Sequence, residues 1–418
     1  MVDDSGRVRQ IAWLDVFPWL RLFKCPRLSL TVSLVVLGFL GWLGMTAGWR
    51  FFAYCWKDST DPVVSAAVSS MELLDWNKLE FQPKSLEIRL PSYDTIAASS
   101  EYLVAFAKTM STPVFLMFTP EASFSGFCFC LLCSVWTILV WSIFGAAITR
   151  IAALALTREH KLGLRGGISF ALLHWPSYAG GPVLPLAACL LLAIPLLTLG
   201  WISRLDAGAF FVSLIWPLAI IGGGLIALLA LGLMLGWPLM WPTISTEATD
   251  SFDGLSRAYS YTLHRPLRYF GYVMLAGILG ALLFYVVTFV VYLVQLMTFW
   301  AFSIGSGVPR LSELHRAIAG ENDGVMYQGA NSVFRFWSQL LNLIPISVAV
   351  SYFWTAMTQV YLLLRRDEDG AELDEVFLPA QDKEFGLPPL KTDAAGVPTV
   401  AEPKPPTNNA PDDTAMGS

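Results

Sequence analysis

The sequence predicts an all-α integral membrane protein with six transmembrane helices, three amphipathic interfacial helices on the cytoplasmic face and a small exoplasmic loop domain. The first observation behind this prediction is composition: of 418 residues, 55% are hydrophobic and only 14% are charged. A soluble domain carries about 25% charged residues. A soluble fold must cover its surface with polar groups, so this deficit indicates a surface that faces lipid.

The second observation is a set of six apolar runs, each near or above the roughly 20 residues that cross a bilayer as a helix. Nearly all of these runs lack Asp, Glu, Lys, Arg and His. The fourth and fifth runs are longer than a perpendicular crossing requires, which predicts tilt, kinks or extension into the interface. The predicted spans are residues 28–49, 124–149, 183–201, 210–241, 269–299 and 336–364 of a membrane domain covering 28–366.

Basic residues near the span ends predict the orientation, because cytoplasmic loops are enriched in Lys and Arg. If the six spans alternate, the basic connections all fall on one side of the membrane, and both termini are cytoplasmic. Residues 1–27 then form a cytoplasmic amphipathic segment, and 367–418 form an acidic, proline-rich cytoplasmic tail that is expected to be disordered. The basic residues are Arg7, Arg9, Arg21, Lys24, Arg27, Arg150, Arg158, Lys161, Arg165, Arg257, Arg265, Arg268, Arg365 and Arg366.

A polar segment, "ISTEATDSFDGLSRAYSYTLHRPLRYF" at 244–270, separates the fourth and fifth spans. Thr249 or Asp250 is suited to cap a helix that begins at Ser251, and Pro266 ends it. An apolar stripe recurs at helical spacing, so we expect this helix to lie in the cytoplasmic interface. The stripe is Phe252, Leu255, Tyr259 and Leu263, and the expected lipid-phosphate contacts are Arg257, His264, Arg265 and Arg268.

The same layout recurs elsewhere in the chain. "LLHWP" at 172–176 matches "TLHRP" at 262–266, and "IAWLDVFPWLRLFKCPRLSL" before the first span is again amphipathic and basic, with Pro26 just ahead of the apolar run. These segments predict three units, each made of an interfacial helix, a proline and a span. Interfacial packing alone is an alternative explanation of the match. His174 and His264 occupy equivalent places before the proline, which favours an interfacial or capping role over catalysis.

Two longer connections lie outside the predicted spans. In the exoplasmic loop 50–123, "KSLEIRLP" alternates as a short strand does, 95–110 is typical of an amphipathic helix, and "VFLMF" within 113–120 is expected to dock on the membrane. The loop at 303–335 holds one histidine among scattered acids. A catalytic or metal site requires such groups to converge, so a solvated loop is the favoured interpretation of Glu313, His315, Arg316, Glu321 and Asp323.

Known catalytic and ligand-binding motifs are missing from the sequence. It contains no Walker A, HExxH or GxSxG motif. "RDEDGAELDE" at 366–375 lacks EF-hand spacing and reads as a solvated acidic stretch, and the cysteines of "CFCLLC" are interpreted as small buried hydrophobes. The net charge of −5 gives no indication of a nucleic-acid partner. We therefore predict no enzyme activity, cofactor or metal.

Two features within the spans concern helix contacts. Gly38, Gly41, Gly44 and Gly48 form a small-residue face that favours close packing inside this protein over dimerisation. The spans lack the charged residues that ion-coupled transporters carry, but neutral polar residues occur in the last two spans. Hydrogen bonding between helices is the favoured interpretation, with a narrow polar path for a solute as the alternative. These residues are Gln295, Gln339, Asn342, Thr355 and Gln359.

Over about residues 240–365 the sequence resembles the membrane domain attached to some glycerophosphodiester phosphodiesterases, and related six-span bacterial families of unknown function. The residues that carry the resemblance are Glu247, the run Leu255-Ser256-Arg257-Ala258 and the basic run 264–268. The resemblance implies the six-span fold, a bacterial cytoplasmic (inner) membrane and a helper or anchoring role. No phosphodiesterase catalytic domain accompanies it.

Together these observations predict a structural role: scaffolding, organisation of the membrane surface or anchoring of partners. The expected partners are membrane lipids and other membrane proteins. The alternative is a permease for a neutral or lipid-like solute, with a path along the last two spans; a membrane-embedded enzyme ranks third.

Overall fold

The computed structural model describes residues 13–72, 106, 108–119, 123–307, 309–310, 312–314, 328–378, 390–392 and 398–400. The chain divides into two compact units, Met1–Val376 and Phe377–Ser418. In the second unit, strands β1 (Leu390–Thr392) and β2 (Pro398–Val400) form an antiparallel pair with Leu390 opposite Val400. This small pair lies in the tail for which the sequence predicts disorder.

The first unit contains six helices that are long and apolar enough to cross a membrane, which confirms the predicted six spans. Most of their ends extend past the predicted runs because flanking residues continue the helix. The first span instead begins at Val32 rather than at 28, because a separate short helix ends at Ser29 and the backbone at Thr31 is extended. The 42 residues of α9 measure about 63 Å at 1.5 Å per residue, compared with about 30 Å for the hydrocarbon core of a bilayer. The six are α3 (Val32–Cys55), α6 (Phe124–Thr157), α8 (Trp175–Ile202), α9 (Asp206–Glu247), α11 (Pro266–Ser306) and α13 (Gln328–Asp369).

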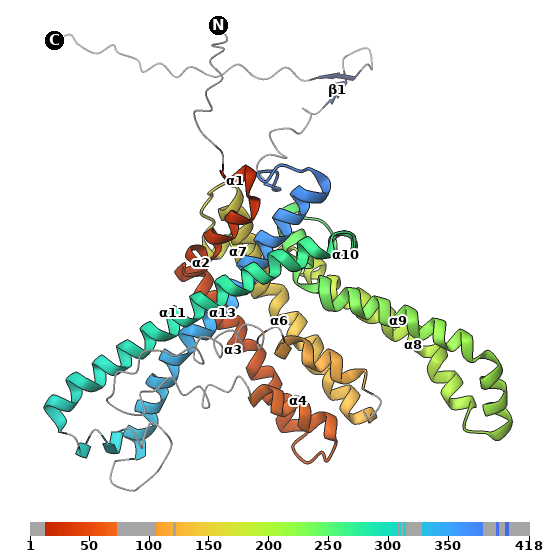
Figure 1. Cartoon of the computed structure of the whole chain (residues 1–418), viewed down its shortest axis with the longest axis horizontal. Coiled ribbons are helices and arrows are strands. Elements are labelled where there is room, and N and C mark those ends of the chain that lie inside the picture. Colours follow the sequence, from red (N-terminus) through yellow and green to blue (C-terminus); the bar gives the residue numbers. More distant parts are fainter. Residues whose placement is uncertain are drawn as a thin grey trace. The chain divides into compact units, whose positions relative to one another are not determined.

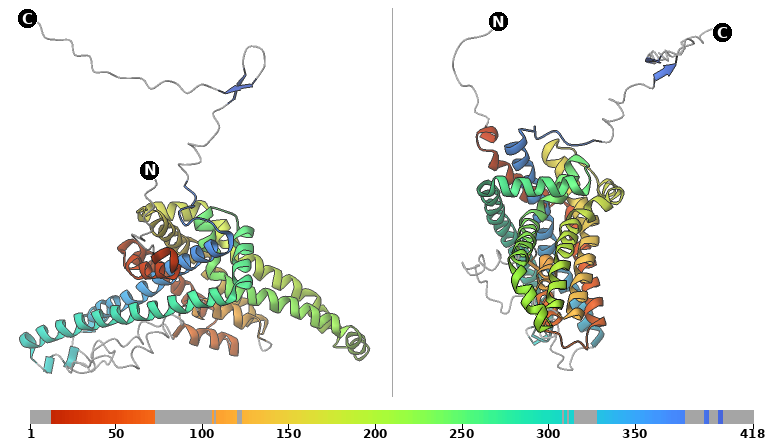
Figure 2. Two further views of the ribbon diagram at one scale, coloured as in Figure 1. Left: turned by 45° about the horizontal axis from the view of Figure 1, so that its top comes forward. Right: turned by 90° about the vertical axis from the view of Figure 1, so that its right-hand side faces the viewer.

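The six helices contact one another most extensively as α8 with α9, α3 with α6, and α13 with both α3 and α11; in Figure 1 they separate as α3 with α6, α8 with α9, and α11 with α13. Within this unit the pairs diverge from a common region that we call the hub (Figures 1 and 2). The helix ends at Glu247 and Asp369 meet there. The short helices of the hub are α1 (Trp13–Val16), η1 (Pro18–Phe23), α2 (Lys24–Ser29), α7 (Leu164–Leu173) and α10 (Ser251–His264).

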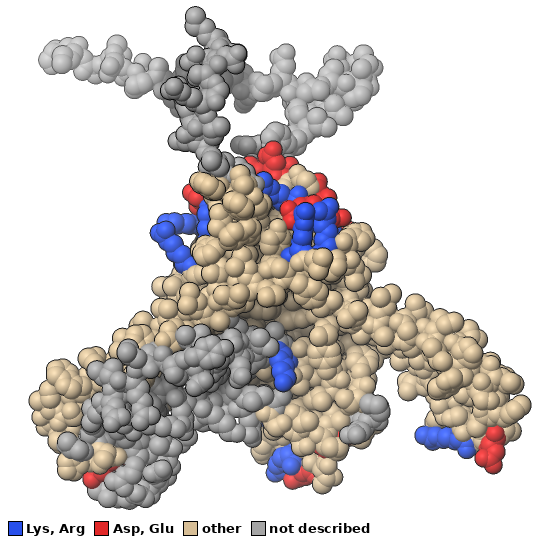
Figure 3. Space-filling view, viewed as in Figure 1, with Lys and Arg blue, Asp and Glu red and all other residues tan. Residues whose placement is uncertain are grey.

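Charged side chains are concentrated at two levels of this unit. On the face shown in Figure 3, most Lys, Arg, Asp and Glu residues lie either at the hub or at the far ends of the helix pairs. The surface between these levels is largely uncharged. Such a separation is what a bilayer requires, since its interior offers no water to solvate charge.

Short helices precede the spans where the sequence predicts them. The side chain of Asp250 caps α10 by accepting a hydrogen bond from the Asp253 amide at 2.9 Å, so the cap is Asp250 rather than Thr249. α10 ends at His264 and α11 begins at Pro266; likewise α7 ends at Leu173 and α8 begins at Trp175, with Pro176 next. The helix–proline–span arrangement is therefore present at both junctions.

The face of α10 that contacts the protein includes only half of the predicted apolar stripe. Its buried residues are small or polar: Gly254, Ala258, Tyr261 and Thr262. Within the predicted stripe, Phe252 is 68% exposed and Leu263 is 45% exposed. Small residues let α10 approach α8 and α9 closely. Leu255 and Tyr259 of the stripe are partly buried against the core, whereas Phe252 and Leu263 point away from it.

The glycine face of α3 packs within this chain, as the sequence predicts. A Cβ atom on Gly38 would lie 2.6 Å from the carbonyl oxygen of Ser347 in α13. A Cβ on Gly48 would overlap the Trp136 ring of α6, and the Trp136 indole donates a hydrogen bond to the Gly44 carbonyl at 3.0 Å. The four-residue spacing thus serves contacts with α6 and α13.

Part of the predicted exoplasmic loop 50–123 packs among the spans. Phe106 is buried, and its ring lies 5.5 Å from Trp141 of α6 and 5.3 Å from Phe353 of α13. A helix at 108–117 follows, running through the stretch expected to dock on the membrane surface. Elsewhere in the loop, α4 covers Pro62–Glu72, and the strand predicted at "KSLEIRLP" lies outside the described residues.

Candidate functional site

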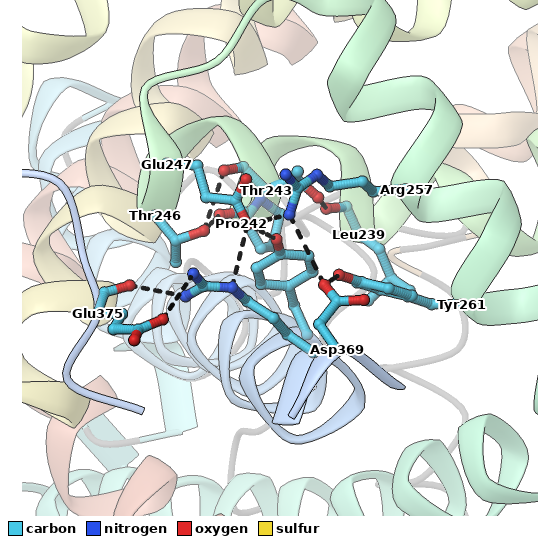
Figure 4. A network of polar contacts seen from close by, with 11 residues as sticks. Leu239, Pro242, Thr243, Thr246, Glu247, Arg257, Tyr261, Asp369 and Glu375 are labelled. Carbon is cyan, nitrogen blue, oxygen red and sulfur yellow. Dashed lines mark hydrogen bonds and ion pairs between the residues drawn. The ribbon is translucent and has the colours of Figure 1, made fainter. Parts of the chain in front are cut away.

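The densest polar arrangement in the described residues is centred on Glu247, at the hub end of α9 (Figure 4). One carboxylate oxygen accepts hydrogen bonds from the Arg257 guanidinium at 2.7 Å and from the Tyr361 hydroxyl at 2.8 Å. The Arg365 Nε lies 3.1 Å from the same oxygen. The Glu247 side chain is only 10% exposed, so one nearly buried carboxylate joins α9, α10 and α13.

Two further carboxylates extend this network. Asp369 lies 3.7 Å from the Arg257 guanidinium and accepts a hydrogen bond from the Tyr261 hydroxyl. The Arg365 guanidinium lies 3.8 Å from the Glu375 carboxylate and donates to the Glu375 backbone carbonyl at 2.7 Å. Burial opposes the charge on Arg257, but Glu247 and the neighbouring tyrosines outweigh it and raise its pKa. Arg257 therefore remains a cation that ties α10 to both α9 and the end of α13.

The basic residues predicted to contact lipid phosphates each lie beside a carboxylate of the same chain. Besides Arg257, the Arg268 guanidinium lies 3.1 Å from Asp367, His264 lies 3.5 Å from Glu368, and Arg265 donates to Glu368. These acids belong to the stretch 366–375 that the sequence analysis interprets as solvated. The compact unit accordingly extends to Val376, beyond the expected boundary at 366. Contact with lipid phosphate stays a prediction.

A second polar cluster surrounds Ser245, two residues before Glu247. Arg150 is 2% exposed, donates to the Ser245 carbonyl at 2.6 Å and lies 4.1 Å from the centre of the Phe170 ring. The Ser245 hydroxyl is 2.6 Å from the Thr149 hydroxyl and 2.8 Å from that of Tyr178. From the sequence, Arg150 is expected only to be one of the basic residues of a loop between two spans. Arg150 directly follows the apolar run 124–149, and no pattern in the sequence there predicts that its charge is buried.

The residues of the predicted polar path lie at two levels along α13. Gln295 donates a hydrogen bond to the Asn342 side chain at 2.8 Å, and both residues are buried. Gln339 lies nearly one turn before Asn342, but Thr355 is about 20 Å further along α13 by helical rise. The Thr355 hydroxyl bonds to the Ser351 carbonyl at 2.8 Å, and Gln359 is 2% exposed. This arrangement is typical of hydrogen bonding within and between helices.

An apolar cavity of about 100 Å³ lies between the 108–117 helix, α6, α8 and α9. The hydroxyl groups in its wall are bonded to backbone carbonyls of their own helices, as with Ser134 to Cys130 at 2.8 Å. It is lined by Met110, Ser111, Val114, Phe115, Phe118, Ser134, Thr137, Ile138, Pro182, Leu186, Cys189, Ala230, Leu233, Met234, Trp237 and Trp241.

The described residues contain no group of three or more His, Cys, Asp or Glu side chains arranged to hold a metal ion. The predicted cluster around His315 lies largely outside those residues, and Glu313 within them pairs with Arg310 at 2.6 Å. At the helix junctions, the Nδ1 atom of His174 lies 3.0 Å from the Phe170 carbonyl oxygen, and that of His264 lies 3.2 Å from the Ser260 hydroxyl. All six cysteines are free.

Comparison of the chain with protein-family models, with curated proteins and with solved structures found no match. The resemblance to the membrane domain attached to glycerophosphodiester phosphodiesterases therefore depends on its residues alone. Two of them, Glu247 and Arg257, are joined in the hub network.

Proposed function

We propose that this chain is a multi-pass membrane scaffold that anchors other membrane proteins. The supporting observation is the exposure of residues 190–231 of α8 and α9, which we call the α8/α9 arm. Within this arm only Val212 is buried. In the most apolar stretch of α9 just 6% of the residues are buried, compared with 78% for α13. The arm therefore offers two long apolar helices to a partner, while α13 holds the protein together.

The hub supplies the rigidity that a scaffold needs. Glu247 fixes the hub end of α9 to Arg257 of α10 and to Arg365 of α13. The largely buried segment 232–246 connects this anchor to the arm and packs against α6, α8, α10 and α13. This fixed half of α9 holds the direction in which the arm points.

Photo-crosslinking in cells tests the scaffold. A photoreactive amino acid at Leu218, which is 67% exposed on the arm, should form discrete adducts with another membrane protein. The same amino acid at Val294, 48% exposed on α11, serves as the matched control. Lipid adducts alone at Leu218, or identical protein adducts at both positions, would contradict the proposal.

The proposal places the hub and both termini on the cytoplasmic side of a bacterial inner membrane, since the basic residues gather at the hub. Cys55 is exposed at the opposite end of α3. An impermeant thiol reagent applied to intact spheroplasts should label Cys55 and spare a cysteine introduced as Ser256→Cys in α10. Labelling of position 256 without labelling of Cys55 would show that the hub faces the outside, which contradicts the proposed orientation.

A permease for a neutral or lipid-like solute, with a path along α11 and α13, is the second candidate, favoured by the buried polar side chains of Gln295 and Asn342. Solute flux into liposomes that is abolished by Gln339→Leu with Asn342→Leu would favour this function. Unchanged flux in the double variant would show that the solute does not pass along Gln339 and Asn342. The hydrogen bond from Gln295 to Asn342 supports a closed contact there.

A further inference from the structure

We infer that the apolar cavity takes up the acyl chain of a membrane phospholipid; this holds whether or not the α8/α9 arm binds a protein. Three of its walls are spanning helices, with Ile138 from α6, Leu186 from α8 and Ala230 from α9. Its surroundings in a bilayer are therefore hydrocarbon rather than water. The molecules present there at high concentration are lipid chains.

The wall chemistry suits a ligand without hydrogen-bonding groups. Thr137 donates its hydroxyl to the Cys133 carbonyl at 2.8 Å, and Ser111 donates to the Lys108 carbonyl at 3.1 Å. Ser134 likewise donates to the Cys130 carbonyl at 2.8 Å. The remaining lining is aliphatic, aromatic or sulfur-containing. A polar solute would lose its hydration here and regain few hydrogen bonds. Methylene groups form no hydrogen bonds, so they give up none when they enter the cavity.

The cavity has an open side and a closed side. Phe115, Phe118 and Met234 line it and are 40–52% exposed, so they border its mouth. Trp241 is 3% exposed, and its indole N–H is donated to the Tyr178 carbonyl at 2.7 Å. The closed end is thus apolar and sealed. This shape admits the methyl end of one chain while the headgroup stays outside.

The inference is tested with the full-length protein in liposomes that contain a phosphatidylcholine carrying a diazirine near the end of one acyl chain. After illumination, mass spectrometry of the digested protein locates the adducts. We expect them to concentrate at 110–118 and 230–241. Adducts spread evenly along α8 and α9 would show that the chain only touches the outer surface and would overturn the inference.

Two variants fill the cavity from opposite walls, Ala230→Trp from α9 and Val114→Phe from the 108–117 helix. Each should reduce the adducts at these segments several-fold. Ala227→Trp is the matched control, since Ala227 is exposed on α9 and is not part of the lining. Each variant is assayed only if it elutes as a single sharp peak, and the second filling variant keeps the test decisive if the first misfolds.

Two results would contradict the inference. One is an equal effect of Ala227→Trp and the filling variants. The other is selective labelling by a diazirine fatty acid but not by the phospholipid, which would assign the cavity to a free fatty acid instead.

Discussion

Both halves of α9 carry large apolar side chains, but these side chains have different surroundings. Between residues 206 and 231, large side chains such as Phe210 and Leu214 are more than 60% exposed. From Gly232 to Thr246, the helix is largely buried against α6, α8, α10 and α13. An apolar side chain gains little free energy when it leaves lipid tails for a contact with protein. Hydrophobicity alone therefore cannot decide which half of α9 packs against the other helices.

Small residues and hydrogen bonds distinguish the buried half. Gly232 and Gly236 let α10 approach α9, and Tyr259 of α10 donates to the Leu229 carbonyl at 2.7 Å. Tyr269 of α11 donates to the Leu235 carbonyl at 2.6 Å. Hydropathy thus determines which segments cross the membrane, while small and polar residues determine which segments meet one another.

The largest expected effect comes from removing Glu247, the acid at the hub end of α9. Glu247→Ala leaves Arg257 and Arg365 without their shared carboxylate and should lower the free energy of unfolding by about 3 kcal/mol. The measurement is denaturant titration in mixed micelles. Asp206→Ala at the exposed end of the same helix is the control, with an expected change below about 1 kcal/mol. Equal losses would show that the hub is not the stabilising end.

Glycines give a second contrast between buried and exposed regions. Gly38→Ala puts a methyl group 2.6 Å from a backbone carbonyl oxygen, so α3 and α13 must separate, at a cost of about 2 kcal/mol. Gly223→Ala on the arm meets nothing within 4 Å and should stabilise α9 by up to about 1 kcal/mol, because glycine weakens helices. The same titration measures both variants, and a loss at Gly223 would indicate a contact on the arm.

Much of the fold is predictable because its determinants are local. Apolar runs gave the six spans, and the polar segment at 244–270 gave the Asp250 cap and the break at Pro266. The glycine spacing in α3 predicted close contact inside the chain. In each of these cases, the residues that determine the structure lie within a few turns of one another.

The hub network and the cavity were not predictable in this way. Glu247 meets Arg365, and Arg150 meets Ser245, across long separations in sequence. From the sequence alone, the acidic stretch after Arg366 is interpreted as solvated. Its basic partners on α10 and α11 lie beside it only in the folded protein. Likewise, the apolar character of Phe106 and Phe115 is compatible with docking on the membrane surface, and only the tertiary arrangement puts them among the spans.

The smallest expected effect concerns Arg268, which the sequence assigns to lipid phosphate and the structure pairs with Asp367. This pair is half exposed on the arginine side, so Arg268→Ala should cost at most about 1 kcal/mol, and less at high salt. Arg204→Ala at the tip of the arm should cost less still. Unfolding measured in liposomes with and without phosphatidylglycerol separates the two assignments. If Arg268 serves only Asp367, lipid charge will not alter the effect; if it also contacts phosphate, the loss will grow in anionic liposomes, because the variant then forfeits both partners.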